Sequence, residues 1–280
     1  MAKFKREFTA KKKEKWEKDG RGQGRFEEYK PWLMKPDVAS DGRSHRFKGN
    51  VIQRKIEVFS DLEYNVFIIF ESEKNIIDAR EQYPLPIEET LAIAEQYGIA
   101  HPTDPVTGEY NVVTTDFVFT FLDRDGKYID IAVAAKYTPD LGSMRTIEKL
   151  NIEKIYWTRH GVQWVIITEE QINKNLAYNI DAVRNVYHLE RTKFLSKVNK
   201  DSLKLIIEDL KNALVGKVII RTICDEYDEK YFLPKGSSIT LARHLIATKQ
   251  LMCDLESRML DFDVLFEVNL GIRRSQVESI

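Results

Sequence analysis

Cysteine is scarce in this sequence, and two features that define other large protein classes are missing. The 280 residues include two cysteines, Cys224 and Cys253, which lie far apart and belong to no CxxC or Cys/His spacing. We therefore expect neither a disulfide framework nor a zinc site. There is no apolar signal-peptide core at the N-terminus and no uninterrupted apolar run of about 18 residues. A cytoplasmic protein without a membrane partner is expected.

A large net charge is also missing. Lys and Arg number 43 and Asp and Glu number 44, so the bulk composition does not indicate a nucleic-acid-binding protein. The charge is uneven, however, because residues 1–50 hold fifteen Lys and Arg against eight Asp and Glu. This segment is a candidate basic arm for DNA phosphates, and a solvated leader is the alternative. The basic residues that could contact DNA, or form an exposed loop, are Arg43, His45, Arg46 and Lys48.

Residues 51–169 predict an α/β domain. Ser60 can cap a helix whose apolar positions recur at three and four residues and which carries Glu63 in its first turn. The Asp125-Gly126 step between two β-rich runs indicates a hairpin. The predicted elements are a helix from Ser60, a strand over 76–84, a helix over 86–97, strands over 112–122 and 128–137, a helix over 143–160 and a strand over 164–168.

The remainder predicts a second, mostly helical domain over 170–262 and a tail over 263–280. Helical patterns cover 169–190, 202–214, 217–231 and 237–252, and a β-like run follows over 262–270. Helices followed by a β-ribbon are typical of a winged helix-turn-helix, although other small helical domains give similar patterns. The last helix carries Arg243 and is either a recognition helix for the major groove or a packing helix.

A possible active site combines charged residues from different predicted elements. Asp116 lies among β-branched and aromatic residues, where a carboxylate is costly unless something binds it. Lys136 ends the partner strand at a similar distance from the turn, so a hairpin places the two side by side, either in a cross-strand salt bridge or in a site. Glu63 and Glu153 lie on the flanking helices. Carboxylates from a helix and a strand with a lysine from the hairpin form the PD-(D/E)xK arrangement of metal-ion nucleases.

The residue types suit phosphodiester cleavage. Mg²⁺ prefers oxygen ligands, a metal polarises the attacking water, and a cation stabilises developing charge. The Asp to Lys spacing alone is a weak signal, because it occurs in many unrelated proteins.

Longer strings of residues add a more specific signal. They are, in order, Tyr29–Trp32, Gly42–Arg46, Phe59–Glu63, Arg80–Leu85, Thr114–Phe117, Val133–Lys136, Thr146–Leu150 and Tyr156–Trp157. With these strings the sequence resembles the TnsA family of transposase endonucleases, over the whole nuclease region and more weakly to the end. The resemblance implies a restriction-endonuclease-like core followed by a winged-helix-like domain.

By this resemblance, Glu63 and Asp116 are metal ligands, Lys136 is the catalytic lysine and Glu153 is an accessory acidic residue. The implied cofactor is Mg²⁺, as one or two ions, with Mn²⁺ as a substitute. The position two before the lysine, usually Glu, Asp or Gln, is Ala134. Either its backbone carbonyl binds the metal or the site is weakened or inactive. Arg80 and Gln82 either line the active cleft and contact DNA or face water on an edge strand.

The resemblance also implies a biological setting. The expected function is Mg²⁺-dependent hydrolysis of the non-transferred (5′) strand at transposon ends, together with a partner transposase of the TnsB type. An AAA+ regulator of the TnsC type is expected to contact the C-terminal region, which makes the tail Arg273–Ile280 a docking candidate. The alternatives are a catalytically silent DNA-binding or scaffolding subunit and, less favoured, a free-standing defence nuclease.

Overall fold

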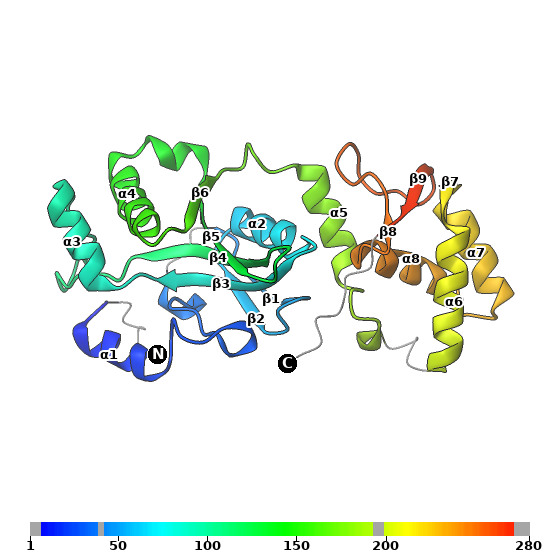
Figure 1. Cartoon of the computed structure of the whole chain (residues 1–280), viewed down its shortest axis with the longest axis horizontal. Helices are drawn as coiled ribbons and strands as arrows, with labels where there is room; N and C mark the ends of the chain where they lie inside the picture. Colours follow the sequence, from blue (N-terminus) through cyan, green and yellow to red (C-terminus); the bar gives the residue numbers. More distant parts are fainter. Residues whose placement is uncertain (1–6, 39–41, 193–198, 272–280) are drawn as a thin grey trace. The chain divides into compact units, whose positions relative to one another are not determined.

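The computed structural model of the chain describes residues 7–38, 42–192 and 199–271. The chain forms two compact units, residues 1–172 and 173–280 (Figure 1). The sequence analysis separated residues 1–50 from the catalytic domain, whereas the first unit includes them. None of the helices in the described ranges is long and apolar enough to cross a bilayer.

A four-stranded sheet, in the order β3-β4-β5-β6, forms the centre of the first unit. Its neighbouring strands are antiparallel except for β5 and β6, which are parallel and are connected through helix α4 (Met144–Arg159). Strands β1 and β2 form a separate antiparallel pair. The strands are β1 (His45–Lys48), β2 (Lys55–Val58), β3 (Ile76–Pro84), β4 (Thr114–Leu122), β5 (Tyr128–Ala135) and β6 (Gln163–Ile167).

Helices pack on both faces of this sheet. Phe117 of β4 contacts Phe67 of α2, with ring centroids 6.0 Å apart. The next residue, Val118, belongs to an apolar cluster with Ile152 and Trp157 of α4. Because consecutive strand residues point to opposite faces, α2 and α4 cover opposite sides of the sheet. The helices are α1 (Ala10–Lys18), α2 (Asp61–Glu71), α3 (Ile87–Tyr97) and α4 (Met144–Arg159), with 3₁₀ turns η1 (Phe26–Glu28), η2 (Lys35–Asp37) and η3 (Thr138–Gly142).

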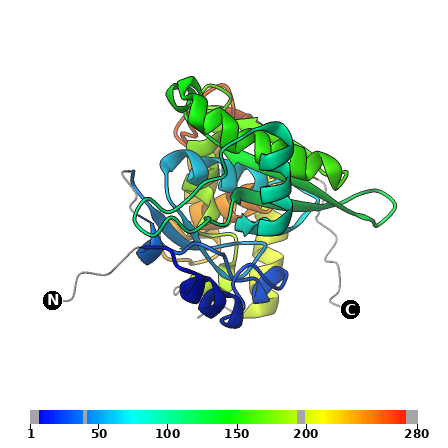
Figure 2. The same cartoon turned by 90° about the vertical axis from the view of Figure 1, so that its left-hand side faces the viewer.

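Residues 7–38 are part of the first unit, and α1 lies on the side of the sheet away from α4 in both views (Figures 1 and 2). Phe8, Trp16 and Trp32 form a buried aromatic cluster. The Arg21 guanidinium lies 4.2 Å from the centre of the Trp16 ring and forms a 2.6 Å ion pair with Asp37. The sequence analysis expected a basic arm or a solvated leader here, whereas these three aromatic side chains anchor the segment in the folded unit.

The second unit combines helices with a small sheet in the order β7-β9-β8. Residues 217–231 were predicted as one helix, but they begin as a strand because Val218 pairs with Phe266 of β9. The predicted helix over 237–252 ends early, since Lys249 adopts a φ of +55° before β8. The elements are α5 (Lys174–Arg184), η4 (Leu189–Arg191), α6 (Lys200–Ala213), β7 (Gly216–Ile219), α7 (Ile220–Lys230), α8 (Ser237–Ala247), β8 (Leu251–Met252) and β9 (Leu265–Leu270).

Candidate active site

Asp116 lies where β4 and β5 stop pairing. The β4–β5 ladder ends at Phe117 and Val133, whereas β5 continues to pair with β6 through Ala135. Asp116 Oδ2 accepts the backbone N–H of Ala135 at 2.8 Å and the ammonium of Lys136 at 2.7 Å. The carboxylate therefore replaces backbone pairing at the point where the two strands separate. Its other oxygen, Oδ1, makes no hydrogen bond with any described residue and remains open to a ligand.

Glu63 is held by the start of α2. Ser60 caps this helix and accepts the Glu63 N–H at 3.1 Å, and the Ser60 hydroxyl donates back to Glu63 Oε1 at 3.1 Å. The Phe59 N–H donates to Glu63 Oε2 at 3.0 Å. This reciprocal cap fixes the carboxylate, which is only 8% exposed. Burial, followed by the charge of Asp116, raises the pKa of Glu63 to about 7.

Glu153 enters the site from α4. Its carboxyl accepts the Thr115 hydroxyl at 3.1 Å, and Thr115 in turn accepts the indole N–H of Trp157 at 2.8 Å. Burial, followed by the charge of Asp116, raises the pKa of Glu153 to about 8. A carboxyl with this pKa is mostly protonated at neutral pH, which reduces repulsion with Asp116.

The Lys136 ammonium interacts electrostatically with all three carboxyl groups of the site. Burial alone would lower its pKa, but the charges of Asp116, Glu153 and Glu63 raise the pKa well above its ordinary value. Lys136 is therefore a cation at any physiological pH, and its side chain keeps 29% exposure. The structure thus brings together Glu63, Asp116, Lys136 and Glu153.

The oxygen atoms suit a hard divalent cation. Glu63 and Asp116 supply carboxylates, and the free oxygen of Asp116 is an open acceptor. Across the described ranges, no group of three or more His, Cys, Asp or Glu side chains is arranged to hold a metal. Two carboxylates leave coordination places for water, a DNA phosphate or a backbone carbonyl. Ala134 is fully buried in β5, and its methyl group offers no ligand.

The basic residues near β1 divide into paired and exposed side chains. The imidazole of His45 lies 2.5 Å from an Asp61 carboxylate oxygen, and Arg46 forms a 2.9 Å ion pair with Glu57. Arg43 and Lys48 are exposed and form no ion pair with the described residues. These two side chains are the ones of this group most available to phosphate.

Arg80 and Gln82 do not face water. Arg80 is 6% exposed and pairs with Asp130 at 2.9 Å, and Gln82 is 4% exposed. Arg80 also lies 3.6 Å from Asp78, so its charge is neutralised within the protein. A direct DNA contact by Arg80 would require these ion pairs to break.

Arg243 is the single exposed residue of α8, and its guanidinium lies 5.7 Å from the centre of the Phe262 ring. The other face of α8 is buried against α5, α6 and α7. Gly236 is the N-cap of α8, and the Asp228 carboxylate accepts the N–H groups of Gly236 and Ser238. The packing alternative therefore describes most of this helix. The tail Arg273–Ile280 lies outside the described residues.

Sequence reasoning missed the supporting residues of the site. Thr115 and Trp157 both lie in the strings that carry the family resemblance, but their contact joins β4 to α4 across 42 residues. No periodicity predicts such a pair. A threonine beside a strand carboxylate was the available signal, because a buried hydroxyl requires a polar partner.

Comparisons with known proteins identify the class of protein to which this chain belongs. Residues 73–169 match the family model described as TnsA-like endonuclease N terminal, and residues 171–255 match TnsA endonuclease C terminal. The transposon Tn7 transposition protein TnsA of Escherichia coli is 34% identical over 230 residues, which cover 82% of this chain and 81% of the relative. The class is thus that of the TnsA-like endonucleases. The chain belongs to the TnsA family.

Proposed function

We propose that this endonuclease is a transposase subunit that hydrolyses the non-transferred (5′) strand at transposon ends in a Mg²⁺-dependent reaction. The observation that carries the proposal is the Asp116–Lys136 pair of 2.7 Å at the separated ends of β4 and β5. Glu63 adds the carboxylate from the helix, and its charge acts on Lys136. Family membership supports DNA as the substrate.

In this proposal Glu63, Asp116 and the Ala134 backbone carbonyl hold Mg²⁺, as one or two ions, or Mn²⁺ in its place. The bound metal supplies an activated water and stabilises negative charge on the phosphate. The open Oδ1 of Asp116 supports the fit, because Oδ2 is already occupied by two donors. The cap at Ser60 presents the Glu63 carboxylate in a fixed orientation.

Lys136 and Glu153 perform different tasks. The Lys136 ammonium neutralises Asp116 and stabilises charge that develops on the scissile phosphate. Glu153 keeps its proton through burial and accepts the Thr115 hydroxyl, so it supports β4 without adding a third negative charge to those of Glu63 and Asp116. It acts as an accessory residue behind the site.

The proposed DNA contacts follow exposure. Arg43 and Lys48 contact phosphates directly, with His45 and Arg46 beside them on β1. Arg80 and Gln82 are buried, so in this proposal they reach DNA only if the ion pairs of Arg80 with Asp78 and Asp130 break. Arg243 contributes from the exposed side of α8. The β4–β5 separation supports a restriction-endonuclease-like core. The order of α6, β7, α7, α8, β8 and β9 supports a winged-helix-like second unit.

The proposed partners are DNA at the transposon ends, a TnsB-type transposase and a TnsC-type AAA+ regulator that contacts the C-terminal region, in the bacterial cytoplasm. A catalytically silent scaffolding subunit is the second candidate function, and the observation that favours it is the missing side-chain ligand at Ala134.

One reconstitution separates the two candidates. Donor DNA with each strand labelled is incubated with Mg²⁺, the partner transposase and either the parent chain or Asp116→Ala. We expect the parent to cut the non-transferred strand, and Asp116→Ala to lose this cut by several orders of magnitude while the partner's own cut persists. Equal cleavage of that strand with both chains would contradict a catalytic role for Asp116 and would favour the scaffolding function.

A further inference from the structure

Gln82 has a backbone conformation that is unfavourable for its residue type. Its φ is +49°, in the left-handed region that residues with a Cβ seldom adopt. It lies in β3 between two antiparallel pairs, Glu81–Phe117 and Tyr83–Thr115. The residue opposite Gln82 in this register is Asp116.

In strand β4, the alternation of side chains between the two faces of the sheet is interrupted beside Gln82. In a regular strand, residues two apart share a face. Phe117 contacts Phe67 of α2, whereas Thr115 accepts a hydrogen bond from Trp157 of α4. Because α2 and α4 cover opposite faces of the sheet, the alternation of β4 shifts between these two residues. Asp116 occupies the position of the shift.

The alternation of side chains in strand β3 is interrupted at the same position along the sheet. The Arg80 guanidinium lies 5.1 Å from the ring of Tyr83, although residues three apart in a regular strand point to opposite faces. Tyr83 also packs against Trp157, with ring centroids 5.6 Å apart. Since both strands shift together, the register of their pairing is the same before and after Gln82.

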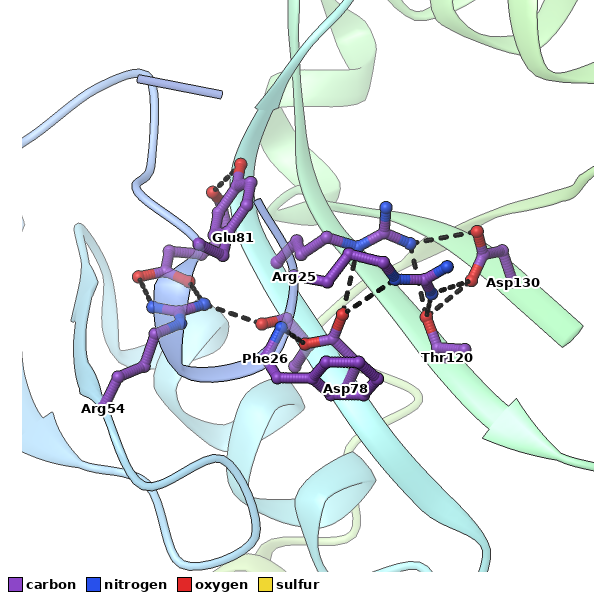
Figure 3. Close-up of polar contacts among 10 residues, drawn as sticks. Arg25, Phe26, Arg54, Asp78, Glu81, Thr120 and Asp130 are labelled. Carbon is purple, nitrogen blue, oxygen red and sulfur yellow. Dashed lines mark hydrogen bonds and ion pairs between the residues drawn. The ribbon is translucent and has the colours of Figure 1, made fainter. Parts of the chain in front are cut away.

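Hydrogen bonds to the backbone of Gln82 and of the preceding residue, Glu81, stabilise the positive φ of Gln82. The hydroxyl of Tyr29 donates to the carbonyl oxygen of Glu81 at 3.0 Å, and the N–H of Trp32 donates to the carbonyl oxygen of Gln82 at 3.2 Å. Arg54 binds both carboxylate oxygens of Glu81, at 2.8 and 2.5 Å (Figure 3). The folded N-terminal segment thus fixes the backbone directly opposite Asp116.

We propose that Gln82 is a positioning residue whose left-handed backbone turns this level of the sheet, so that the Asp116 carboxylate reaches Ala135 and Lys136. The inference rests on the proposed nuclease function. The backbone conformation of Gln82, more than its carboxamide side chain, sets the orientation of the metal-binding Asp116 carboxylate. Among the described residues, the carboxamide oxygen accepts one hydrogen bond, from the Thr114 hydroxyl at the long distance of 3.3 Å.

Three substitutions at Gln82 distinguish the effect of its backbone conformation from the effect of its side chain. Gln82→Gly and Gln82→Asn both tolerate a positive φ, whereas Gln82→Val strongly disfavours it because its side chain branches at Cβ. Mn²⁺ affinity of the purified full chain is measured by calorimetric titration, and folding is checked by circular dichroism. We expect Gly and Asn to keep the affinity within about threefold and Val to lower it at least about tenfold.

A milder variant tests the same link if Gln82→Val does not fold. Tyr29→Phe removes the hydroxyl that donates to Glu81 but keeps the ring, and we expect a loss of about two- to fivefold in Mn²⁺ affinity. Tyr227→Phe in the second unit is the matched control, because it also removes a tyrosine hydroxyl from a backbone carbonyl, that of Asp209. The control is expected to leave Mn²⁺ affinity unchanged.

The outcomes distinguish this inference from the proposed function. If Gly lowers affinity as much as Val, the carboxamide is responsible and the inference is overturned. If Asp116→Ala loses Mn²⁺ while Gln82→Val, or Tyr29→Phe where Val does not fold, binds it like the parent, the inference fails and the function stands. If the parent binds no Mn²⁺, both fail.

Discussion

The Lys136 ammonium and the Asp116 carboxylate are 2.7 Å apart, and the contact is made to the same oxygen that accepts a backbone N–H. The side chain of Asp116 therefore has one oxygen committed to the protein and one open. An ordinary cross-strand salt bridge would not need the backbone donor. This division of the two oxygens suits a carboxylate that must remain fixed while it binds a ligand.

The first prediction compares the two members of this pair. Asp116→Ala should lose both Mn²⁺ binding and cleavage, because it removes a metal-binding oxygen. Lys136→Ala should lose about 10²-fold or more in cleavage but bind Mn²⁺ within about tenfold of the parent, since an ammonium cannot be a ligand. Calorimetric titration and strand-specific cleavage assays of the same samples provide the comparison. Loss of metal by Lys136→Ala would mean that the lysine maintains the site structurally.

The second prediction concerns pH. With the pKa of Glu63 at about 7, a proton competes with metal for this carboxylate in acidic solution. Metal affinity should rise by about one log unit per pH unit below pH 7 and then level off. Mn²⁺ titrations at several pH values between about 5.5 and 8 measure this slope. A constant affinity over that range would show that Glu63 does not bind the ion in its ionised form.

The third prediction concerns stability without metal. The pKa of Glu153 is about 8 in the folded chain, against an ordinary carboxyl value of about 4.3 when unfolded. The folded state therefore holds the proton more tightly, and this contribution to the free energy of unfolding is complete below the unfolded pKa. It is lost as pH rises toward 8, by up to about 1.4 kcal/mol per pH unit.

Glu153→Gln cannot ionise, and it should be more stable than the parent at pH 8 but not at pH 5. Denaturant unfolding at the two pH values, without divalent ions, measures the difference. Glu95→Gln on α3 replaces an exposed carboxylate and serves as the control. A Glu153→Gln difference that does not change with pH would show that Glu153 is ionised in the folded chain.

The fourth prediction addresses Ala134. If its backbone carbonyl occupies the coordination place, Ala134→Gln adds a ligand that is not needed and should not increase Mn²⁺ affinity. Ala134→Met has a similar volume without an oxygen and controls for crowding at this fully buried position. A gain of about tenfold with Gln and none with Met would show that the place is empty in the parent.

Local signals predicted much of the first unit. Strand β3 was predicted over 76–84 and is observed there, and Ser60 caps α2 as expected. The prediction that the Asp125-Gly126 step joins two strands is also confirmed, because β4 and β5 pair across it. These elements follow from alternation, capping and turn chemistry, which depend on neighbouring residues.

The sequence did not predict features that depend on distant contacts. Strands β1 and β7 are short, and pairing with β2 and β9 stabilises them. The positive φ of Gln82 has no local signal, because glutamine is neither a turn residue nor a glycine. In the site, residue types and spacing identified the charged group, but only the fold shows which oxygen of Asp116 is open.

The folded N-terminal segment has an evolutionary consequence. Arg25 and the N–H of Phe26 both contact the buried carboxylate of Asp78, and Arg25 also reaches Thr120 (Figure 3). A change at residue 25 would leave that carboxylate with one charged neighbour fewer, so selection should act on positions 25, 78 and 120 together. Relatives that exchange their N-terminal segment should therefore also change position 78, near the start of β3, and position 120, near the end of β4. Grafting this segment alone between family members should yield poorly folded hybrids.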